Sequence, residues 1–287
     1  MNRGHFGNGD LRAAALLAGA LAAAPVCAQT PEEKTPPAEH SAEELAKKLS
    51  NPISDLVSIP FQLNWNQGVG PDDDLQFQLN IQPVVPFTLS KDWNLIARMI
   101  VPYLSQPVLF PGGEPVSGLS DITLSMFLSP RGSGRLTWGV GPVFGLPMTT
   151  DPLLGSGKWL MGATAVGLMQ NGGWTYGALV NQVFSIANTG SVPRNYVSQA
   201  YMQPFVAYTT KNTFTFTLSS ESSYNWEAAS DQRWTVPLIG SVSKLTRLGP
   251  FPFSMQLGAG YYAAKPDNGP NWKLRMAFVV LLPRAAK

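Results

Sequence analysis

Long stretches that alternate between apolar and polar side chains are the feature that most constrains this chain. Between Val57 and Trp65 every odd position is apolar, while the even positions are Ser, Pro, Gln and Asn. Leu75–Ile81, Thr213–Ser219 and Phe253–Tyr261 repeat the same period of two. Because successive side chains of a strand point to opposite faces, the two faces of these strands must meet different environments. The sequence therefore predicts an all-β protein.

The lengths of these alternating stretches indicate what the strands cross. Most have ten to fourteen residues, whereas soluble strands average about five or six and a tilted membrane-spanning strand needs about nine to eleven. The pattern is weakest in 158–169, which is rich in Gly and Ala. Twelve strands are expected, near residues 55–66, 75–86, 93–104, 118–129, 136–147, 158–169, 174–185, 197–208, 213–226, 232–245, 253–263 and 272–283.

The composition agrees with a membrane location. Only 13% of the 287 residues are charged, against about a quarter in an ordinary soluble domain. The net charge of +2 argues against nucleic-acid binding, and the single Cys excludes a disulfide scaffold. At membrane depth every backbone polar group has to be paired, so the sheet has to close. We expect a closed antiparallel transmembrane β-barrel of about twelve strands in the outer membrane of a Gram-negative bacterium.

The tryptophans distinguish this barrel from a soluble β-sandwich, whose strands also alternate. A sandwich would bury some indoles in mid-strand, whereas the strands of a membrane barrel carry aromatic girdles at both interfaces. All eight tryptophans fall at or near the ends of the expected strands: Trp65, Trp93, Trp138, Trp159, Trp174, Trp226, Trp234 and Trp272.

The N-terminus has the layout of an export signal. Arg3 and Arg12 accompany the Ala- and Leu-rich run from Leu11 to Val26, and Ala28 offers a cleavage position. We interpret 1–28 as a signal peptide, in preference to a membrane anchor or a lipidated Cys27. A solvated linker follows over 29–52, and the barrel itself is expected over 53–287. The linker includes a short periplasmic helix near 41–49, with Ser41 and Glu44 as a capping box, whose role as a spacer or a plug the sequence leaves open.

The links between strands indicate topology. An even strand number leaves both barrel termini in the periplasm. Links after even strands are mostly short, such as 90–92 and 171–173, and those after odd strands are often longer, such as 105–117. Short periplasmic turns and longer outer loops are the usual asymmetry. Asp72, Asp73 and Asp74 read as a solvated acidic loop rather than a divalent-cation site, so no metal site is predicted.

Several short stretches resemble a family of bacterial outer-membrane transporters related to the group named for the MetA pathway of phenol degradation, some of whose members carry the label neuromedin U. The resemblance runs from about residue 41 to the end, and it implies an outer-membrane barrel without a settled substrate or catalytic residues. One departure from many such barrels is that the last strand ends at Leu282 and Pro283, without a terminal aromatic. The matching stretches are Glu44–Gln62, Leu79–Pro86, Gly118–Asp121, Gly139–Pro142, Leu154–Trp159, Trp174–Gly177 and Trp234–Pro237.

Charged residues on the expected inward face mark a candidate constriction. A charge facing lipid at mid-membrane costs about 2–4 kcal/mol, so such residues turn inward or towards an interface. One interpretation is a plug of ion pairs that blocks passage. The other is a constriction whose excess of positive charge favours anionic or polar solutes. The six candidates are Arg98, Asp121, Glu221, Arg233, Lys273 and Arg275.

Catalytic motifs are scarce. The two histidines, His5 and His40, precede the barrel, and no expected strand contains His or Cys. Ser-His and Cys-His catalysis and His-based metal sites are therefore not expected, and the sequence predicts neither an enzyme nor a cofactor. The Gly155–Lys158 stretch departs from a phosphate-binding loop, because Trp159 replaces the Ser or Thr. Gly139 and Gly141 are expected to leave room in the lumen.

These observations lead to two hypotheses. In the first, the chain is an outer-membrane channel that passes a small polar, anionic or aromatic solute by passive diffusion through a polar lumen. In the alternative, it is a non-conducting structural or surface-interaction barrel. The expected partners are outer-membrane lipid, a small-molecule solute and the barrel-assembly machinery, with no nucleic acid.

Overall fold

The computed structural model describes residues 41–132, 136–189, 194–249 and 251–282. The chain divides into two units, Met1–Glu39 and His40–Lys287, of which only the second contains described residues. The expected signal peptide at 1–28 and the first part of the linker lie outside the described residues. All that follows concerns the second unit.

The described chain consists of one short helix followed by strands. The helix α1 spans Ala42–Leu49, and a single 3₁₀ turn, η1, spans Pro152–Leu154. The strand segments are β1 (Val57–Val69), β2 (Asp74–Ile81), β3 (Val84–Thr88), β4 (Trp93–Gln106), β5 (Val116–Leu119), β6 (Ile122–Pro130), β7 (Leu136–Leu146), β8 (Lys158–Asn171), β9 (Trp174–Asn188), β10 (Ser198–Thr209), β11 (Phe214–Ser220), β12 (Ser222–Asn225), β13 (Trp234–Leu248), β14 (Phe251–Ala264) and β15 (Trp272–Leu282).

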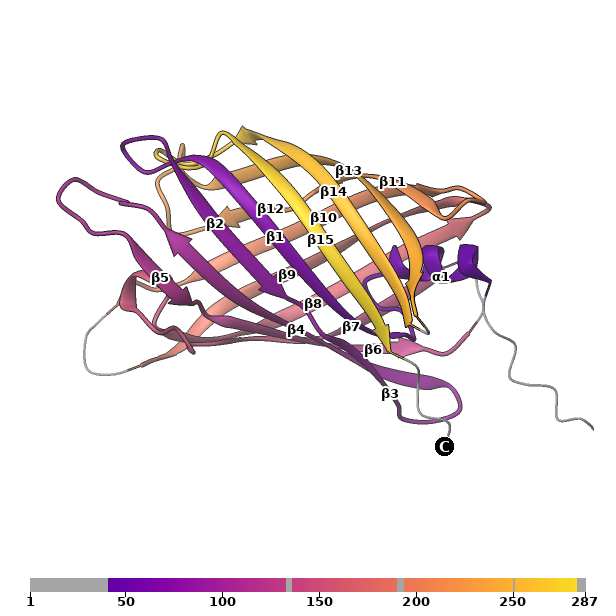
Figure 1. Cartoon of the computed structure of the whole chain (residues 1–287). Coiled ribbons are helices and arrows are strands. Elements are labelled where there is room, and N and C mark those ends of the chain that lie inside the picture. Colours follow the sequence, from indigo (N-terminus) through magenta and orange to yellow (C-terminus); the bar gives the residue numbers. More distant parts are fainter. Residues whose placement is uncertain (1–40, 133–135, 190–193, 250, 283–287) are drawn as a thin grey trace, which may run out of the picture. The chain divides into compact units, whose positions relative to one another are not determined.

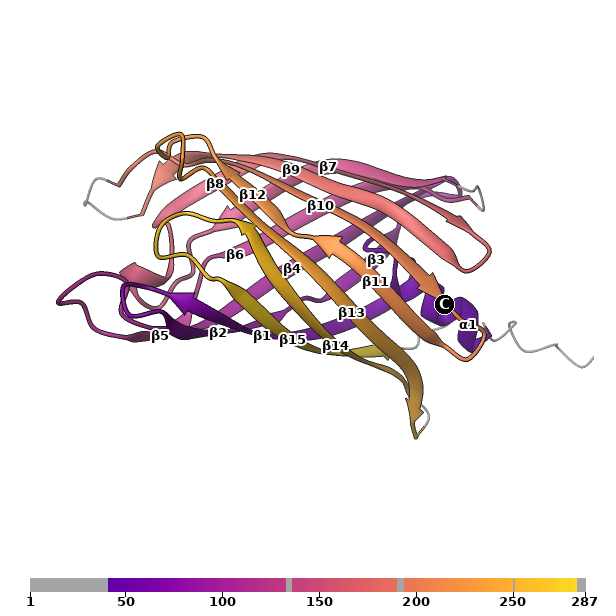
Figure 2. The same cartoon turned by 90° about the horizontal axis from the view of Figure 1, so that it is seen from above.

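All of these segments belong to one antiparallel sheet, and that sheet is closed (Figures 1 and 2). The last segment, β15, pairs with the first, β1, from Val57 opposite Leu282 to Gln67 opposite Trp272. Three strands are interrupted, so that β2–β3, β5–β6 and β11–β12 are each two parts of one strand and the barrel has twelve strands. The predicted fold is confirmed, and the Gly- and Ala-rich stretch is the regular strand β8.

A proline lies in or across from each of the three interruptions. Pro83 lies in the gap between β2 and β3, Pro102 of β4 lies across from the gap between β5 and β6, and Pro237 of β13 lies across from the gap between β11 and β12. A proline has no backbone N–H to give to the ladder, so pairing stops there. Gln82 and Glu221 lie at two of these interruptions, and both line the barrel interior.

The two faces of the barrel wall are inverted relative to a soluble protein. On β11, Phe216 and Leu218 are 54% and 58% exposed on the outside, whereas the inward Thr215 is 5% exposed. The buried hydroxyls of Thr209 and Thr215 lie 3.0 Å apart on the inner face. Apolar side chains outside and polar ones inside are the arrangement that a lipid environment requires. Among the described residues, no helix is both long and apolar enough to cross a membrane.

The two ends of the barrel differ in their links. At one end, here named the short-link end, 89–92, 172–173 and 210–213 join neighbouring strands. At the other, the long-link end, 107–115 and 147–157 do so, and we take the short-link end as periplasmic. Trp93, Trp138 and Trp174 lie near the short-link end, and the other five tryptophans lie towards the long-link end.

The helix α1 lies across the lumen at the short-link end (Figure 1). Ser41 and Glu44 form the predicted capping box at its start. On one side the buried Ala46 packs against Leu245 of β13 and Leu281 of β15. On the other side Gln170 of β8 donates to the backbone oxygen of Lys47 at 3.1 Å. Since β8 and β15 belong to different parts of the wall, the helix bridges the mouth of the barrel.

Candidate functional site: the lumen cavity

The barrel encloses a cavity of about 640 Å³ whose wall is uneven in chemistry. Segments β1, β2 and β11 to β15 contribute amides, hydroxyls and charges, whereas β7, β8 and β9 contribute mainly apolar side chains. Four charged side chains are among the described residues of the lining, and three of them are positive: Arg98, Glu221, Lys273 and Arg275. The cavity thus carries a formal excess of two positive charges.

An ion-pair network occupies the part of the cavity towards the long-link end. Arg275 of β15 binds Glu221 through two parallel hydrogen bonds of 2.7 Å, from Nη1 and Nη2. Its Nε donates to Asn64 Oδ1 at 2.8 Å. The Nζ of Lys273 is 3.9 Å from the same carboxylate and 5.5 Å from the ring centre of Tyr262. A bidentate arginine–carboxylate pair held by a third partner fixes the geometry of this wall.

Two amides lie between this network and a second arginine. Arg98 of β4 donates from Nη2 to Gln82 Oε1 at 2.8 Å. Gln82 in turn donates from Nε2 to Gln62 Oε1 at 2.7 Å. Turning the Gln62 amide would let its oxygen accept from Arg275 Nη1 at 2.9 Å, but its nitrogen would then face the Gln82 nitrogen. Gln62 therefore binds either Gln82 or Arg275, and the amides stand between the two guanidinium groups without linking both at once.

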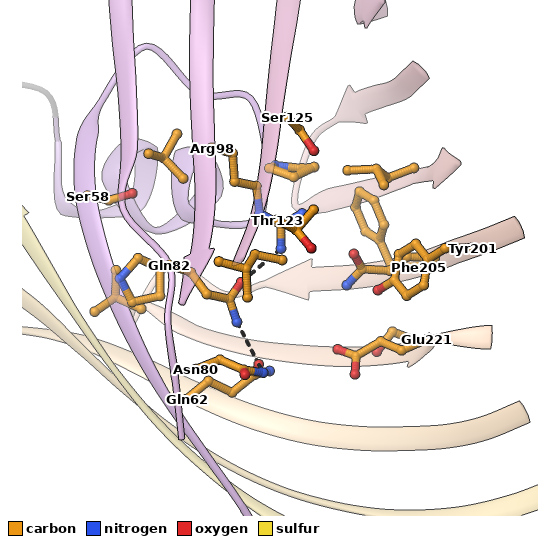
Figure 3. A pocket seen from close by; sticks show the side chains of 18 of the residues that line it. Ser58, Gln62, Asn80, Gln82, Arg98, Thr123, Ser125, Tyr201, Phe205 and Glu221 are labelled. Carbon is orange, nitrogen blue, oxygen red and sulfur yellow. Dashed lines mark hydrogen bonds between the residues drawn. The ribbon is translucent and has the colours of Figure 1, made fainter. Parts of the chain in front are cut away.

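The surroundings of Arg98 differ from those of Arg275. No described carboxylate lies within ion-pair distance of Arg98, and the guanidinium has five N–H donors, of which one binds Gln82. Figure 3 shows Arg98, Gln82 and Thr123 across the cavity from Tyr201, Phe205 and Glu221. Tyr201 and Phe205 come from β10 and are half-buried, so their rings form part of the facing wall.

The floor of the cavity is the segment between α1 and β1. Ile53 is 2% exposed and packs inside the barrel with Val84, Ile96, Phe127, Val166 and Leu179. These partners come from β3, β4, β6, β8 and β9, so the contact extends around a large part of the wall. Asn51, Pro52 and Ser54 line the cavity above this apolar layer. Residues 41–55, which we name the plug segment, therefore occupy the lumen at the short-link end.

Gly139 of β7 makes room for this floor. A Cβ at this position would lie 3.1 Å from the Cβ of Phe127 and 3.3 Å from Cδ1 of Ile53. Both distances are shorter than ordinary van der Waals contacts, so a larger residue would push against the plug segment. The expectation that this glycine leaves room in the lumen is met in a specific way: the room is taken by Ile53.

The structure brings four of the six predicted constriction residues to one cavity and places two elsewhere. Asp121 lies between β5 and β6, where its Oδ2 accepts from the backbone N and Oγ of Ser156 at 2.6 and 2.7 Å and holds the 147–157 link. Arg233 lies beside β13 at the long-link end and donates to the Ala228 oxygen at 2.9 Å. Within the described ranges, no three His, Cys, Asp or Glu side chains gather into a metal-binding group.

Sequence patterns missed two sets of residues in the site. Tyr201 and Phe205 point inward from a strand in which the outward Met202 and Val206 are also apolar, so alternation carries no signal for the direction of either ring. Ile53 was missed because it precedes the first strand and because its side chain packs against residues that are far away in the sequence. Gly139 was the available sign that the lumen had to accommodate something bulky. Gly141 was expected to do the same, but a Cβ there would meet the backbone oxygen of Met126, so it makes room for the neighbouring strand instead.

Comparison with known proteins gives matches to structures. No protein-family model matches the sequence, and no curated protein matches it. An outer membrane channel from Pseudomonas putida F1 matches with a TM-score of 0.58 and 15% identity, covering 79% of this chain and 94% of that one. The NanC porin matches with a TM-score of 0.53 and 8% identity, covering 79% of this chain and all of that one. At these identities the likeness establishes the fold.

The prediction that the chain is not an enzyme needs correction. Outer membrane phospholipase A from Escherichia coli is among the matched structures, at 14% identity with a TM-score of 0.44, covering 85% of this chain and 99% of that one. A TM-score this low assigns no activity to the chain. The sequence argument excluded enzymes too broadly, because it reasoned only from which histidines and cysteines lie on strands. What the comparisons establish is an outer-membrane β-barrel, located in the bacterial outer membrane.

Proposed function

We propose that this barrel is a channel that passes a small polar, anionic or aromatic solute by passive diffusion through its polar lumen. The observation that carries the proposal is the cavity of about 640 Å³, with three cationic side chains and one carboxylate in its described lining. A barrel that only needed a stable interior could fill it with apolar side chains. Water-accessible amides and an excess of positive charge are features of a solute path.

The resemblance of the sequence to the transporter family related to the phenol-degradation group supports the same proposal. So does the fold shared with the outer membrane channel from Pseudomonas putida F1. We extend the proposal to the remaining predicted residues. Arg233, at the long-link end, adds positive charge at the mouth, and Asp121 holds the outer link that borders it. The eight tryptophans anchor the barrel at the two headgroup levels.

Passage through this lumen requires the plug segment to move. In the arrangement seen here, α1 bridges the short-link end and Ile53 packs against one side of the wall above it. The same observation favours the alternative function, a barrel that does not conduct and presents its long links to the outside. The two functions differ in one measurable property, which is whether solute crosses the membrane.

Planar-bilayer recording and liposome swelling test the proposal directly. The mature chain and a variant lacking residues 41–55 are reconstituted side by side, with sugars, carboxylates and phenols as solutes. We expect conductance and swelling with the mature chain, and larger values with the variant. A matched control lacks ten residues of the linker, 30–39, and retains the plug segment; it should behave as the mature chain does. Absence of conductance and swelling from both the mature chain and the 41–55 deletion would refute the channel.

A further inference from the structure

Arg98 is a cation with unused hydrogen-bonding capacity inside the lumen. Its partner Gln82 is 8% exposed and is itself held by Gln62, so the guanidinium is positioned rather than free to rotate. Arg275 is in the opposite state, since Glu221 and Asn64 occupy its three nitrogens. A half-buried guanidinium whose outer edge faces a cavity is a site for an anion. Its planar fork matches a carboxylate in particular.

Aromatic side chains face this guanidinium. Tyr201 and Phe205 are four residues apart on β10, on the same face of the strand, and both line the cavity (Figure 3). The wall beyond them, formed by Leu160, Leu179 and Val183, is apolar. A ligand that reaches Arg98 with one end therefore meets ring and aliphatic surface with the other. Pockets of about 300–1,000 Å³ with a few placed polar groups are usual for small ligands, and the volume of this one falls in that range.

From this geometry we infer that the lumen binds small aromatic carboxylates, with the carboxylate on Arg98 and the ring against Tyr201 and Phe205. A guanidinium with no described carboxylate within ion-pair distance matches a single negative charge. The amides around it, from Gln82 and Gln62, are neutral and do not repel the anion. The inference rests on the proposed function, because it names the solute class that such a channel would select.

Binding is measured apart from transport, so that the two proposals can fail separately. Isothermal titration calorimetry of the full mature protein in detergent uses three probes: benzoate, benzyl alcohol and acetate. We expect benzoate to bind most tightly, because only benzoate offers both the charge and the ring. Failure of the mature protein to bind benzoate, or acetate binding as tightly as benzoate, would overturn the inference.

Two variants test which side chain contacts the carboxylate of the ligand and which contacts its ring. Arg98→Gln should weaken benzoate binding by about tenfold or more, because a charge-assisted pair is lost, and leave benzyl alcohol binding unchanged. Phe205→Leu should weaken benzoate binding and leave acetate unchanged. The matched control is Arg247→Gln, since Arg247 is an exposed arginine near the short-link end of β13 and does not line the cavity. Unchanged benzoate affinity in Arg98→Gln would overturn the assignment.

Heat-dependent mobility in gel electrophoresis verifies that each variant forms the barrel. If Arg98→Gln does not form the barrel, Phe205→Leu still tests the binding site. Transport is then measured by benzoate flux into liposomes. Binding without flux through any form would leave the ligand site standing and refute the channel. Flux without saturable binding would leave the channel standing and refute the site.

Discussion

The two ends of the lumen are lined by different kinds of interaction. Towards the long-link end, Glu221, Arg275 and Lys273 belong to strands of the wall and are fixed to one another by charge-assisted hydrogen bonds. At the short-link end, the contact between wall and plug segment is mainly apolar, through Ile53 and Ala46. The first network can move only if strands move. The second joins the wall to a segment outside the sheet, so it can open while the barrel stays intact.

This difference suggests that the long-link end selects the solute and that the short-link end closes the lumen. Charged groups anchored in the wall give a solute path its preference, because they keep their positions whatever passes. The contact of the plug segment with the wall is mainly apolar, with a hydrogen bond from Gln170 to the Lys47 oxygen beside it, so removal of an apolar member should weaken the closure. The variants that follow are arranged from the largest expected effect to the smallest, and each perturbs one end of the lumen while leaving the other unchanged.

Deletion of residues 41–55 should have the largest effect, because it removes the floor of the cavity together with α1. We expect a lasting rise in single-channel conductance, with ion preference similar to that of the mature chain since Arg275 and Glu221 remain. Conductance in planar bilayers and the reversal potential in a salt gradient measure the two properties. A deletion variant with the same conductance as the mature chain would show that the plug segment does not close the lumen.

Ile53→Asp breaks the seal without shortening the chain. Full burial of an isoleucine is worth about 1.5–3 kcal/mol, which corresponds to roughly a ten- to hundredfold change in the ratio of open to closed states. The aspartate adds the cost of a charge in an apolar layer, so the effect should reach at least the upper part of that range. Open probability in single-channel records is the measurement. Leu153→Asp, at an exposed position of the 147–157 link, is the control and should leave open probability unchanged.

Glu221→Gln acts at the other end and should alter selectivity rather than closure. It leaves Arg275 and Lys273, which are 7% and 6% exposed, without their carboxylate. Loss of one partner of a buried ion pair costs about 3–5 kcal/mol, so the thermal midpoint should fall clearly. The excess of positive charge in the lumen rises by one, and the reversal potential should shift towards anions. The exposed Glu227→Gln should do neither, and a similar shift in both variants would contradict the assignment.

The sequence predicts the wall better than the contents of the lumen, and the reason is periodicity. Each strand carries its own alternation, so the twelve strands, their closure and the inward direction of Lys273 and Arg275 follow from local patterns. The capping box at Ser41 and Glu44 is equally local, and it is present. Where the alternation fails, as around Tyr201 and Phe205, the direction of the side chains could not be predicted.

Contacts between distant parts of the chain were beyond sequence patterns. Ile53 meets Leu179, and Glu221 meets Arg275 through two hydrogen bonds, although each pair is far apart in the sequence. Charge on an inward face indicated that cations and carboxylates share the lumen, but not which of them pair. That distinction matters here, because Arg275 is paired with Glu221, whereas Arg98 has no carboxylate within ion-pair distance in the part of the chain that the structure describes. Asp121 illustrates the same limit: it holds a link through Ser156 instead of joining the charged cluster.

Gly139→Ala should give the smallest effect and the finest test of the seal. The added methyl would lie 3.1 Å from Phe127, which is fixed in β6, and 3.3 Å from Ile53, which is held only by packing. We therefore expect the plug segment to give way rather than the strand. The strain is about 1 kcal/mol, which predicts an increase of a few-fold in open probability.

Thermal stability alone would mislead in this case, because replacing a glycine also stabilises a chain by about 0.4–1 kcal/mol through its unfolded state. Gly167→Ala supplies the correction, since a methyl at that position of β8 meets no atom within 4 Å. Gly167→Ala should stabilise the chain through its unfolded state as Gly139→Ala does, and it should leave the open probability unchanged. If both variants open equally, the contact between Gly139 and Ile53 has no part in closure, and the seal must depend on α1 and its packing against Leu245 and Leu281.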